Sequence, residues 1–67
     1  MQKFDKYKEN LRHSKSNNEI KIFSYDTLVA TCEDGENLIQ SKYYSITTQK
    51  HINYAAKCLD LVLKKTF

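Results

Sequence analysis

Apolar and polar residues alternate along the middle of this chain, and a period of two is typical of β-strands. The alternation runs through EIKIFSY from Glu19 and TLVATCE from Thr27, and NLIQSKYY follows a turn signal at Asp34-Gly35. Successive side chains of a strand point to opposite faces of a sheet, so each stretch presents one apolar side. The pattern predicts a three-stranded antiparallel meander over residues 19–44.

The strand register follows from the two connections. If residues 25–27 form the first, Ile22 lies opposite Ala30, and a two-residue turn at Asp34-Gly35 then brings the third strand into the same pattern. One face is expected to be core, and it carries Ile20, Ile22, Leu28, Ala30, Cys32 and Ile39. The other face is expected to meet a partner, and its candidate binding residues are Lys21, Phe23, Val29, Leu38, Gln40 and Lys42.

The first part of the chain has a helical period. In QKFDKYKENLRH, apolar side chains recur at Phe4, Tyr7 and Leu11 among charged residues, which predicts an amphipathic helix over residues 1–13. The polar stretch SKSNNE, residues 14–19, is expected to be a loop. This first helix could fold over the second sheet face, so an open face and a covered face remain alternatives.

A second helix is predicted from residue 47 to residue 60 or beyond. Its apolar stripe consists of Ile52, Ala55, Ala56, Leu59, Val62 and Leu63. Thr47 or Thr48 is expected to cap the first turn through its hydroxyl, which makes His51 a first-turn residue with a surface or cap-region imidazole. Residues 61–66 fit either the end of this helix or a short final strand, because no proline or glycine marks a boundary there.

These elements form one α+β domain over residues 1–67, in the order helix, three strands, helix (αβββα). A chain of 67 residues lies near the lower limit for independent folding and holds a single core. Such a core rarely gains more than about 3–5 kcal/mol by itself. A homodimer formed through an exposed edge strand, or a bound partner, would add stability.

No catalytic, metal or cofactor site is expected. A nucleophilic hydroxyl needs a base and an orienting acid, and Ser45, Thr47 and His51 have no carboxylate near them in sequence. Cys32 and Cys58 form no CxxC pair and are expected to be reduced, buried thiols without zinc. The single glycine excludes a glycine-rich phosphate loop. The chain is therefore not expected to be an enzyme.

Charge and hydropathy bear on partners and location. The net charge of +3 allows an acidic partner without demanding one. No apolar run is long enough to cross a membrane, and no signal segment begins the chain. A cytoplasmic protein without membrane contact is expected.

The stretches KIFSYDTLVAT, DGENLI and YYSITTQKHINY resemble a group of small phage and prophage proteins that carry a domain of unknown function. The shared pattern is an S-Y-x-T-x-V-A strand pair, a tyrosine-bearing strand, and Y-S-x-T-T-x-K-H-I at the start of a helix; it covers residues 21–56. The resemblance implies a phage or mobile-element origin and an α+β fold, and it assigns no catalytic residue. In similar sequences a glycine often lies near Asp60 and an extended segment follows, but this chain lacks that glycine.

Two classes of function fit these features. The first is a small accessory protein of a phage or mobile element that binds and inhibits a host or defence protein in the host cytoplasm, an anti-defence role. The alternative is a small nucleic-acid-binding or transcription-regulatory protein, in which Phe23, flanked by Lys21 and Lys42, stacks on a base. No motif in the chain identifies the partner.

Overall fold

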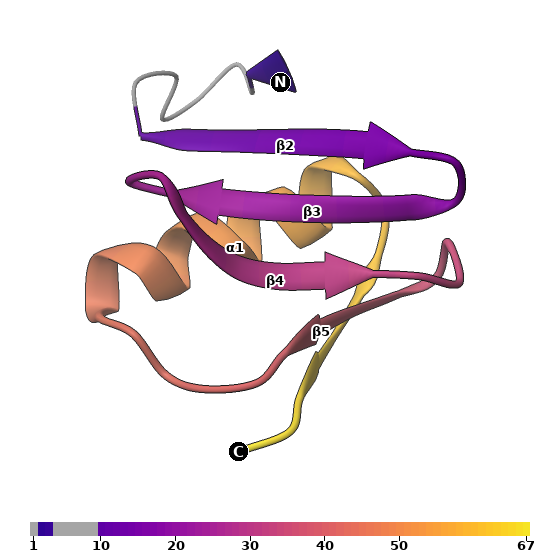
Figure 1. Ribbon diagram of the computed structural model, residues 1–67. Coiled ribbons are helices and arrows are strands. Elements are labelled where there is room, and N and C mark those ends of the chain that lie inside the picture. Colours follow the sequence, from indigo (N-terminus) through magenta and orange to yellow (C-terminus); the bar gives the residue numbers. More distant parts are fainter. Residues whose placement is uncertain (1, 4–9) are drawn as a thin grey trace.

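A computed structural model describes residues 2–3 and 10–67 of the protein. The described residues form one sheet of six strands and one α-helix, so the fold is mostly β (Figure 1). The elements are β1 (Gln2–Lys3), β2 (Leu11–Ser16), β3 (Glu19–Ser24), β4 (Thr27–Cys32), β5 (Asn37–Gln40), α1 (Ile46–Cys58) and β6 (Val62–Lys65).

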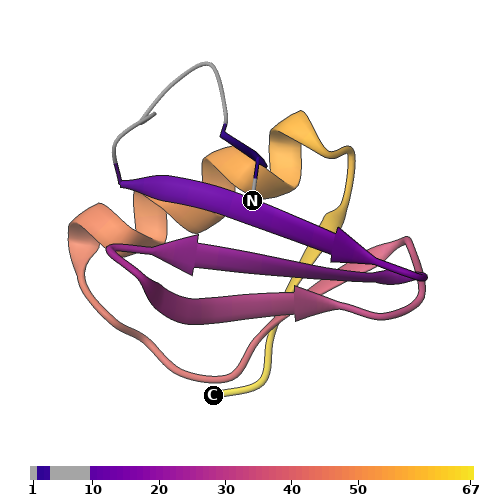
Figure 2. The same ribbon diagram turned by 45° about the horizontal axis from the view of Figure 1, so that its top comes forward.

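The strands lie across the sheet in chain order, β1-β2-β3-β4-β5-β6. Neighbours are antiparallel from β1 to β5, whereas β6 runs parallel to β5. Parallel neighbours need a crossover connection, and α1 supplies it by crossing one face of the sheet (Figures 1 and 2). The sheet therefore has an inner face, which packs against α1, and an outer face on the opposite side.

The predicted helix over residues 1–13 is wrong, and with it the αβββα order. Residues 2–3 and 11–13 lie in β1 and β2, which pair antiparallel with each other. Phe4 and Tyr7, which suggested the helix, lie outside the described residues. Strand β2 therefore begins inside the segment that the helical period predicted to be a helix.

The β2–β3 hairpin explains why this segment is extended. Its turn consists of Asn17 and Asn18, and Asn17 adopts φ 55°, a left-handed conformation that asparagine tolerates. Leu11 fits a helical stripe and an alternating strand equally well, and its pairing opposite Ser24 places it in the core. The predicted loop over residues 14–19 is also wrong, because β2 and β3 occupy most of it.

The β3–β4 hairpin contains a bulge that the alternating pattern does not reveal. Residues 25–26 form a two-residue turn with φ 51° and 66°, the positive values that a primed hairpin turn requires. The predicted pairing of Ile22 with Ala30 is confirmed, but Val29 is an extra residue of β4 without a partner in the register. Val29 and Ala30 are consequently both buried, and Leu28 belongs to the outer face.

The β4–β5 connection comprises residues 33–36 rather than a two-residue turn at Asp34-Gly35. The Asp34 carboxylate accepts hydrogen bonds from the backbone N–H groups of Asn37 and Glu36, each at 2.8 Å. These bonds, that from Asn37 foremost, lower the pKa of Asp34 to about 2. The ionised side chain thereby holds the connection in its longer form.

The longer connection shifts β5 by one residue from the predicted register. Thr31 lies opposite Ile39, whereas the predicted turn would place Thr31 opposite Leu38. A shift of one residue exchanges the two faces of a strand. Leu38 and Gln40 are therefore buried, and Ile39 is exposed on the outer face.

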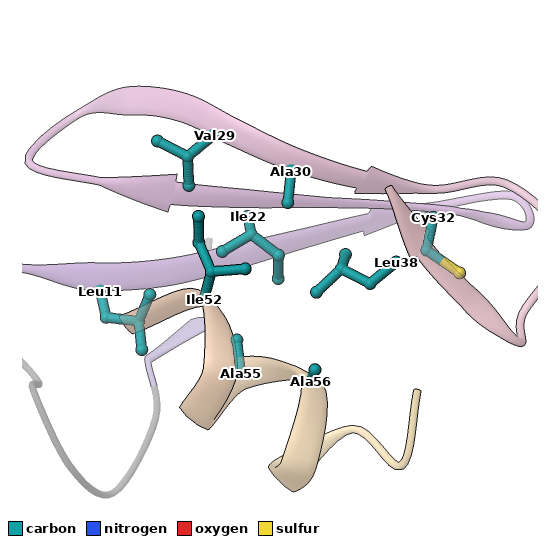
Figure 3. Close-up of a cluster of buried hydrophobic side chains, with 9 residues drawn as sticks. All are labelled: Leu11, Ile22, Val29, Ala30, Cys32, Leu38, Ile52, Ala55 and Ala56. Atoms are coloured by element: carbon teal, nitrogen blue, oxygen red, sulfur yellow. The ribbon is translucent and has the colours of Figure 1, made fainter. Parts of the chain in front are cut away.

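The core lies between the inner face and α1 (Figure 3). It consists of Leu11, Ile22, Val29, Ala30, Cys32, Leu38, Ile52, Ala55 and Ala56. Ile22, Ala30 and Cys32 confirm part of the predicted core face. Leu28 and Ile39, which were predicted beside them, lie outside the core because of the bulge and the register shift.

The end of α1 resolves the alternative that the sequence left open for residues 61–66. The N–H of Leu61 donates to the carbonyl of Ala56 at 2.8 Å, and that of Asp60 donates to the carbonyl of Lys57 at 3.3 Å. This pair of bonds, with Asp60 at φ 56°, is a Schellman motif that ends the helix. The chain then continues as β6, a short final strand.

Candidate interaction surface

The outer face of the sheet combines apolar and basic side chains. Cross-strand partners share a face, so the register defines the rows of side chains that lie side by side. One row consists of Arg12, Phe23 and Leu28, and a second consists of Ser14, Lys21, Thr31, Ile39 and Lys64. In the described part of the chain, the only helix lies on the inner face (Figure 2). The outer face is therefore not covered by a second layer of these elements.

Several large apolar side chains are accessible on this face. Leu28, Ile39 and Val62 are 43%, 37% and 57% exposed, and Phe23 is half-buried. The hydroxyl of Tyr44 donates to the carbonyl of Leu28 at 3.3 Å, which brings an aromatic ring to the same region. Contiguous apolar groups rimmed by polar ones mark interaction sites more often than scattered single residues do.

The cations of the outer face differ in how they are paired. Arg12 lies 2.8 Å from Asp26, and Lys21 lies 3.4 Å from Glu19. Lys64 makes no ion pair with a described residue. The face is thus basic, but two of its cations already have carboxylate neighbours.

Three of the predicted binding residues are accessible. Lys21 and Phe23 lie on the outer face, in adjacent rows. Lys42 is exposed in the segment after β5, and its ammonium nitrogen lies 5.1 Å from the ring centre of Tyr44, within the range of a cation–π contact. Contact of these residues with a partner stays a prediction.

The other three predicted binding residues, Val29, Leu38 and Gln40, are buried on the inner face, so their placement on an open face was wrong. Gln40 has a structural partner. Its Nε2 donates to Oε1 of Gln49 at 2.7 Å and to the carbonyl of Lys42 at 2.8 Å, and Nε2 of Gln49 donates back at 3.0 Å. The paired amides join β5 to α1.

A polar cluster also lies inside the protein, where α1 meets the end of β3. Nδ1 of His51 lies 2.8 Å from Oγ of Ser24, which in turn lies 3.3 Å from Oγ1 of Thr48. The ring of Tyr25 lies against the imidazole, with 5.6 Å between the ring centres. His51 is 1% exposed, so a surface position is wrong, and because α1 begins at Ile46 the residue also lies beyond the first turn, where it was predicted. Burial lowers the pKa of the imidazole.

The serine and histidine of this cluster resemble a nucleophile and its base, but their burial argues for a structural role. Ser24 is only 2% exposed, so a substrate carbonyl has no access to its hydroxyl oxygen in this structure. The hydrogen bonds instead satisfy polar groups that would be costly to bury alone. The cluster joins β3 to α1.

The hydroxyl cluster before α1 does supply a helix cap, but through a different residue. Oγ of Ser45 accepts a hydrogen bond from the backbone N–H of Thr48 at 3.1 Å, so the predicted caps Thr47 and Thr48 are wrong. Thr47 is exposed, and Thr48 points its hydroxyl toward the buried cluster. The sequence showed a serine and two threonines at suitable positions without distinguishing between them.

A hollow in the described surface lies beyond the C-terminal end of α1. Its volume is about 510 Å³, and its walls include His13, Lys15, Glu33, Asp34 and Leu61. Asp34 is fully engaged by hydrogen bonds from the chain, as described above. The hollow therefore offers no unengaged pair of acidic ligands.

The two cysteine thiols lie in different environments. Cys32 is buried as predicted, whereas Cys58 is exposed, so the prediction of two buried thiols is half wrong. Within residues 2–3 and 10–67, no three histidine, cysteine or acidic side chains gather as a metal site. No helix of that part of the chain has the length and apolarity needed to cross a membrane.

Comparison with known proteins places this chain in a wider group. The model of a family of unknown function, DUF8033, matches residues 2–60. No curated protein and no solved structure matches the chain. The matched range runs from β1 to the turn after α1 and ends before β6.

Proposed function

We propose that this chain, which belongs to the family of unknown function DUF8033, is a non-enzymatic module that binds a partner protein through the outer face of its sheet. The observation that carries this proposal is the accessibility of Leu28, Ile39 and Val62 on one face. Leu28 lies beside Phe23, Ile39 lies between Thr31 and Lys64, and Val62 lies beside Asn37, so apolar side chains of this face have polar and charged neighbours. Protein interfaces commonly have an apolar core and a polar rim.

The side chains of this face also indicate what the partner presents. Phe23 lies between Arg12 and Leu28 in its row and supplies an aromatic group of the kind enriched among dominant interface residues. Lys64 adds a positive charge without a carboxylate neighbour among the described residues. A partner with an apolar centre and acidic margins would complement this face.

The class of partner that we propose rests on the resemblance of residues 21–56 to phage and prophage proteins. That resemblance favours a host or defence protein as the target in the host cytoplasm. Binding alone would then inhibit the target, by covering a surface that the target needs. This role requires no catalytic group of the chain.

Nucleic acid is the second candidate, and the outer face supports it less well. Single-stranded nucleic acid needs aromatic side chains that stand clear of the surface for base stacking. Phe23 is half-buried, and Arg12 and Lys21 both have carboxylate neighbours that compete with phosphate. One partly covered ring is a weak stacking platform, so a protein partner is favoured.

The test is a pull-down from host extract with and without nuclease, using variants of the outer face and of α1. Leu28→Glu and Ile39→Glu each place a negative charge among the apolar side chains of the outer face. Lys50→Glu, a larger change in charge at an exposed position of α1, is the control. Melting temperatures identify any variant that has lost its fold. A specific protein that survives nuclease, binds Lys50→Glu and fails to bind both outer-face variants is expected. The proposal would be contradicted if Leu28→Glu and Ile39→Glu still retained the partner protein, or if nuclease treatment removed all the material that the parent retains.

A further inference from the structure

The last strand, β6, forms one edge of the sheet. β6 pairs with β5 on one side and is the final member of the strand order. No other strand in the described part of the chain pairs with its second side. A strand in this position presents a row of backbone hydrogen-bonding groups that another extended chain can use.

The register shows which residues of β6 present those groups. The N–H of Val62 donates to the carbonyl of Glu36 at 2.8 Å, and that of Thr66 donates to the carbonyl of Gln40 at 2.9 Å. In a parallel pair, alternate residues direct their N–H and C=O toward the same neighbour. Residues 62, 64 and 66 therefore point toward β5. The backbone N–H and C=O of residues 63 and 65 point away from the sheet.

The side chains around this edge are basic. Lys64 and Lys65 are adjacent and exposed, so they project to opposite faces of the sheet. Lys64 belongs to the outer face, in a row with Ile39. β6 contains no acidic residue. An added strand would thus meet a positive charge on each of its two faces.

Charge also distinguishes an acidic partner strand from a second copy of this chain. Two β6 strands that paired with each other would bring together Lys64 and Lys65 from both copies, with no acidic residue from either strand to offset them. Lysine on an edge strand is a common means by which proteins prevent such self-pairing. Glutamate or aspartate on an incoming strand would instead be attracted, because cross-strand pairs of opposite charge are stabilising.

We propose that the open edge of β6 binds an extended acidic segment of another protein by strand addition. Backbone bonds to residues 63 and 65 would hold the segment, and Lys64 and Lys65 would select its acidic side chains. This inference goes beyond the binding face proposed above, because it uses the backbone groups at the edge of β6, although the side chain of Lys64 belongs to both surfaces.

The test uses a short fluorescent peptide of alternating glutamate and valine, with binding followed by anisotropy. Lys65→Pro removes both the charge and the outward backbone N–H, and an edge strand tolerates proline at such a position. Lys65→Ala removes the charge alone. Lys65→Ala should weaken binding, and Lys65→Pro should weaken it by up to about tenfold more, the effect of one lost hydrogen bond. The comparison requires that both variants keep the melting temperature of the parent. In the parent protein, amide exchange should slow at residues 63 and 65 when the peptide binds.

Three outcomes would overturn the proposal. They are equal binding of a peptide with lysine in place of glutamate, equal binding by Lys65→Pro and Lys65→Ala, and a β6-dependent dimer of the chain in sedimentation. The Leu28→Glu variant separates this test from that of the outer face. It should bind the peptide as the parent does, even though it is expected to lose the partner of the outer face.

Discussion

Ser24 and His51 meet inside the protein, with the serine hydroxyl oxygen 2.8 Å from Nδ1 of the imidazole, although 27 positions separate them in the chain. This contact joins the last residue of β3 to the first half of α1. It fixes the helix over the sheet at the end where the β3–β4 turn lies. Stability should therefore depend on the protonation state of this histidine.

Stability should fall when the pH drops below the ordinary pKa of histidine. Burial lowers the pKa of His51 in the folded protein, so the unfolded chain, with a pKa of about 6.5, binds the proton more readily. The contribution of His51 is then complete above about pH 6.5 and is lost as the pH falls toward the lower pKa of the folded state. Urea unfolding at several pH values between about 8 and 5 measures this effect.

His51→Asn is the matched variant for the pH experiment, because its amide can occupy the position of Nδ1 without titrating. The variant should show a weaker dependence on pH in the same window. Some dependence should remain, since burial also lowers the pKa of His13. An unchanged pH profile in His51→Asn would mean that this histidine does not control the acid sensitivity.

Replacement of the helix cap should reduce stability at one hydroxyl residue and not at its neighbour. Ser45→Ala removes the acceptor of the Thr48 N–H and should lower the free energy of unfolding by about 0.5–2 kcal/mol. Thr47→Ala removes an exposed hydroxyl and should change stability by less than about 0.5 kcal/mol. If chemical denaturation showed an equal loss in the free energy of unfolding for both variants, Ser45 would not be the specific cap of the helix.

Substitution at the end of α1 should stabilise the protein. Asp60 adopts φ 56°, and glycine takes that conformation without the steric cost of a side chain. Asp60→Gly should therefore raise the free energy of unfolding, by about 0.5–1 kcal/mol. Asp60→Ala is the control and should lower it, because alanine has no side-chain oxygen to favour the left-handed region. A lower melting temperature for Asp60→Gly than for Asp60→Ala would contradict the role of this conformation.

The two thiols should react at very different rates. Cys58 is exposed on α1, whereas Cys32 is 0% exposed in the core. A thiol reagent should label one cysteine rapidly in the folded protein and the second only as the chain unfolds. Cys58→Ser should abolish the fast phase. Rapid labelling of both thiols under native conditions would show that the core opens more readily than this packing implies.

The parts of the fold that local pattern predicts well are those that depend on a single period. Alternation in residues 19–24 and 27–32 predicted two strands, and the pairing of Ile22 with Ala30 was confirmed. The apolar stripe of α1 likewise predicted a helix at that position. These features follow from the geometry of one element and the side on which its apolar residues lie.

The candidate binding surface was harder to predict, because it depends on small changes in register. The extra residue at Val29 put Val29 on the inner face and Leu28 on the outer face. The shift of one residue in β5 likewise put Leu38 on the inner face and Ile39 on the outer face. Neither change alters the alternation of the sequence. The shift in β5 instead depends on the hydrogen bonds that Asp34 makes in the β4–β5 connection.

The amino-acid sequence by itself determined where the central strands and the helix form, since steric preferences and the apolar period act over a few neighbouring residues. Tertiary structure decided the conformation of segments whose local sequence fits a helix and a strand about equally well. Leu11 joins a strand because β3 offers it a partner, and β6 forms because α1 ends where β5 has a free edge. The choice between the faces was also made in three dimensions, where only one side of the sheet could be buried against the single helix of the described chain.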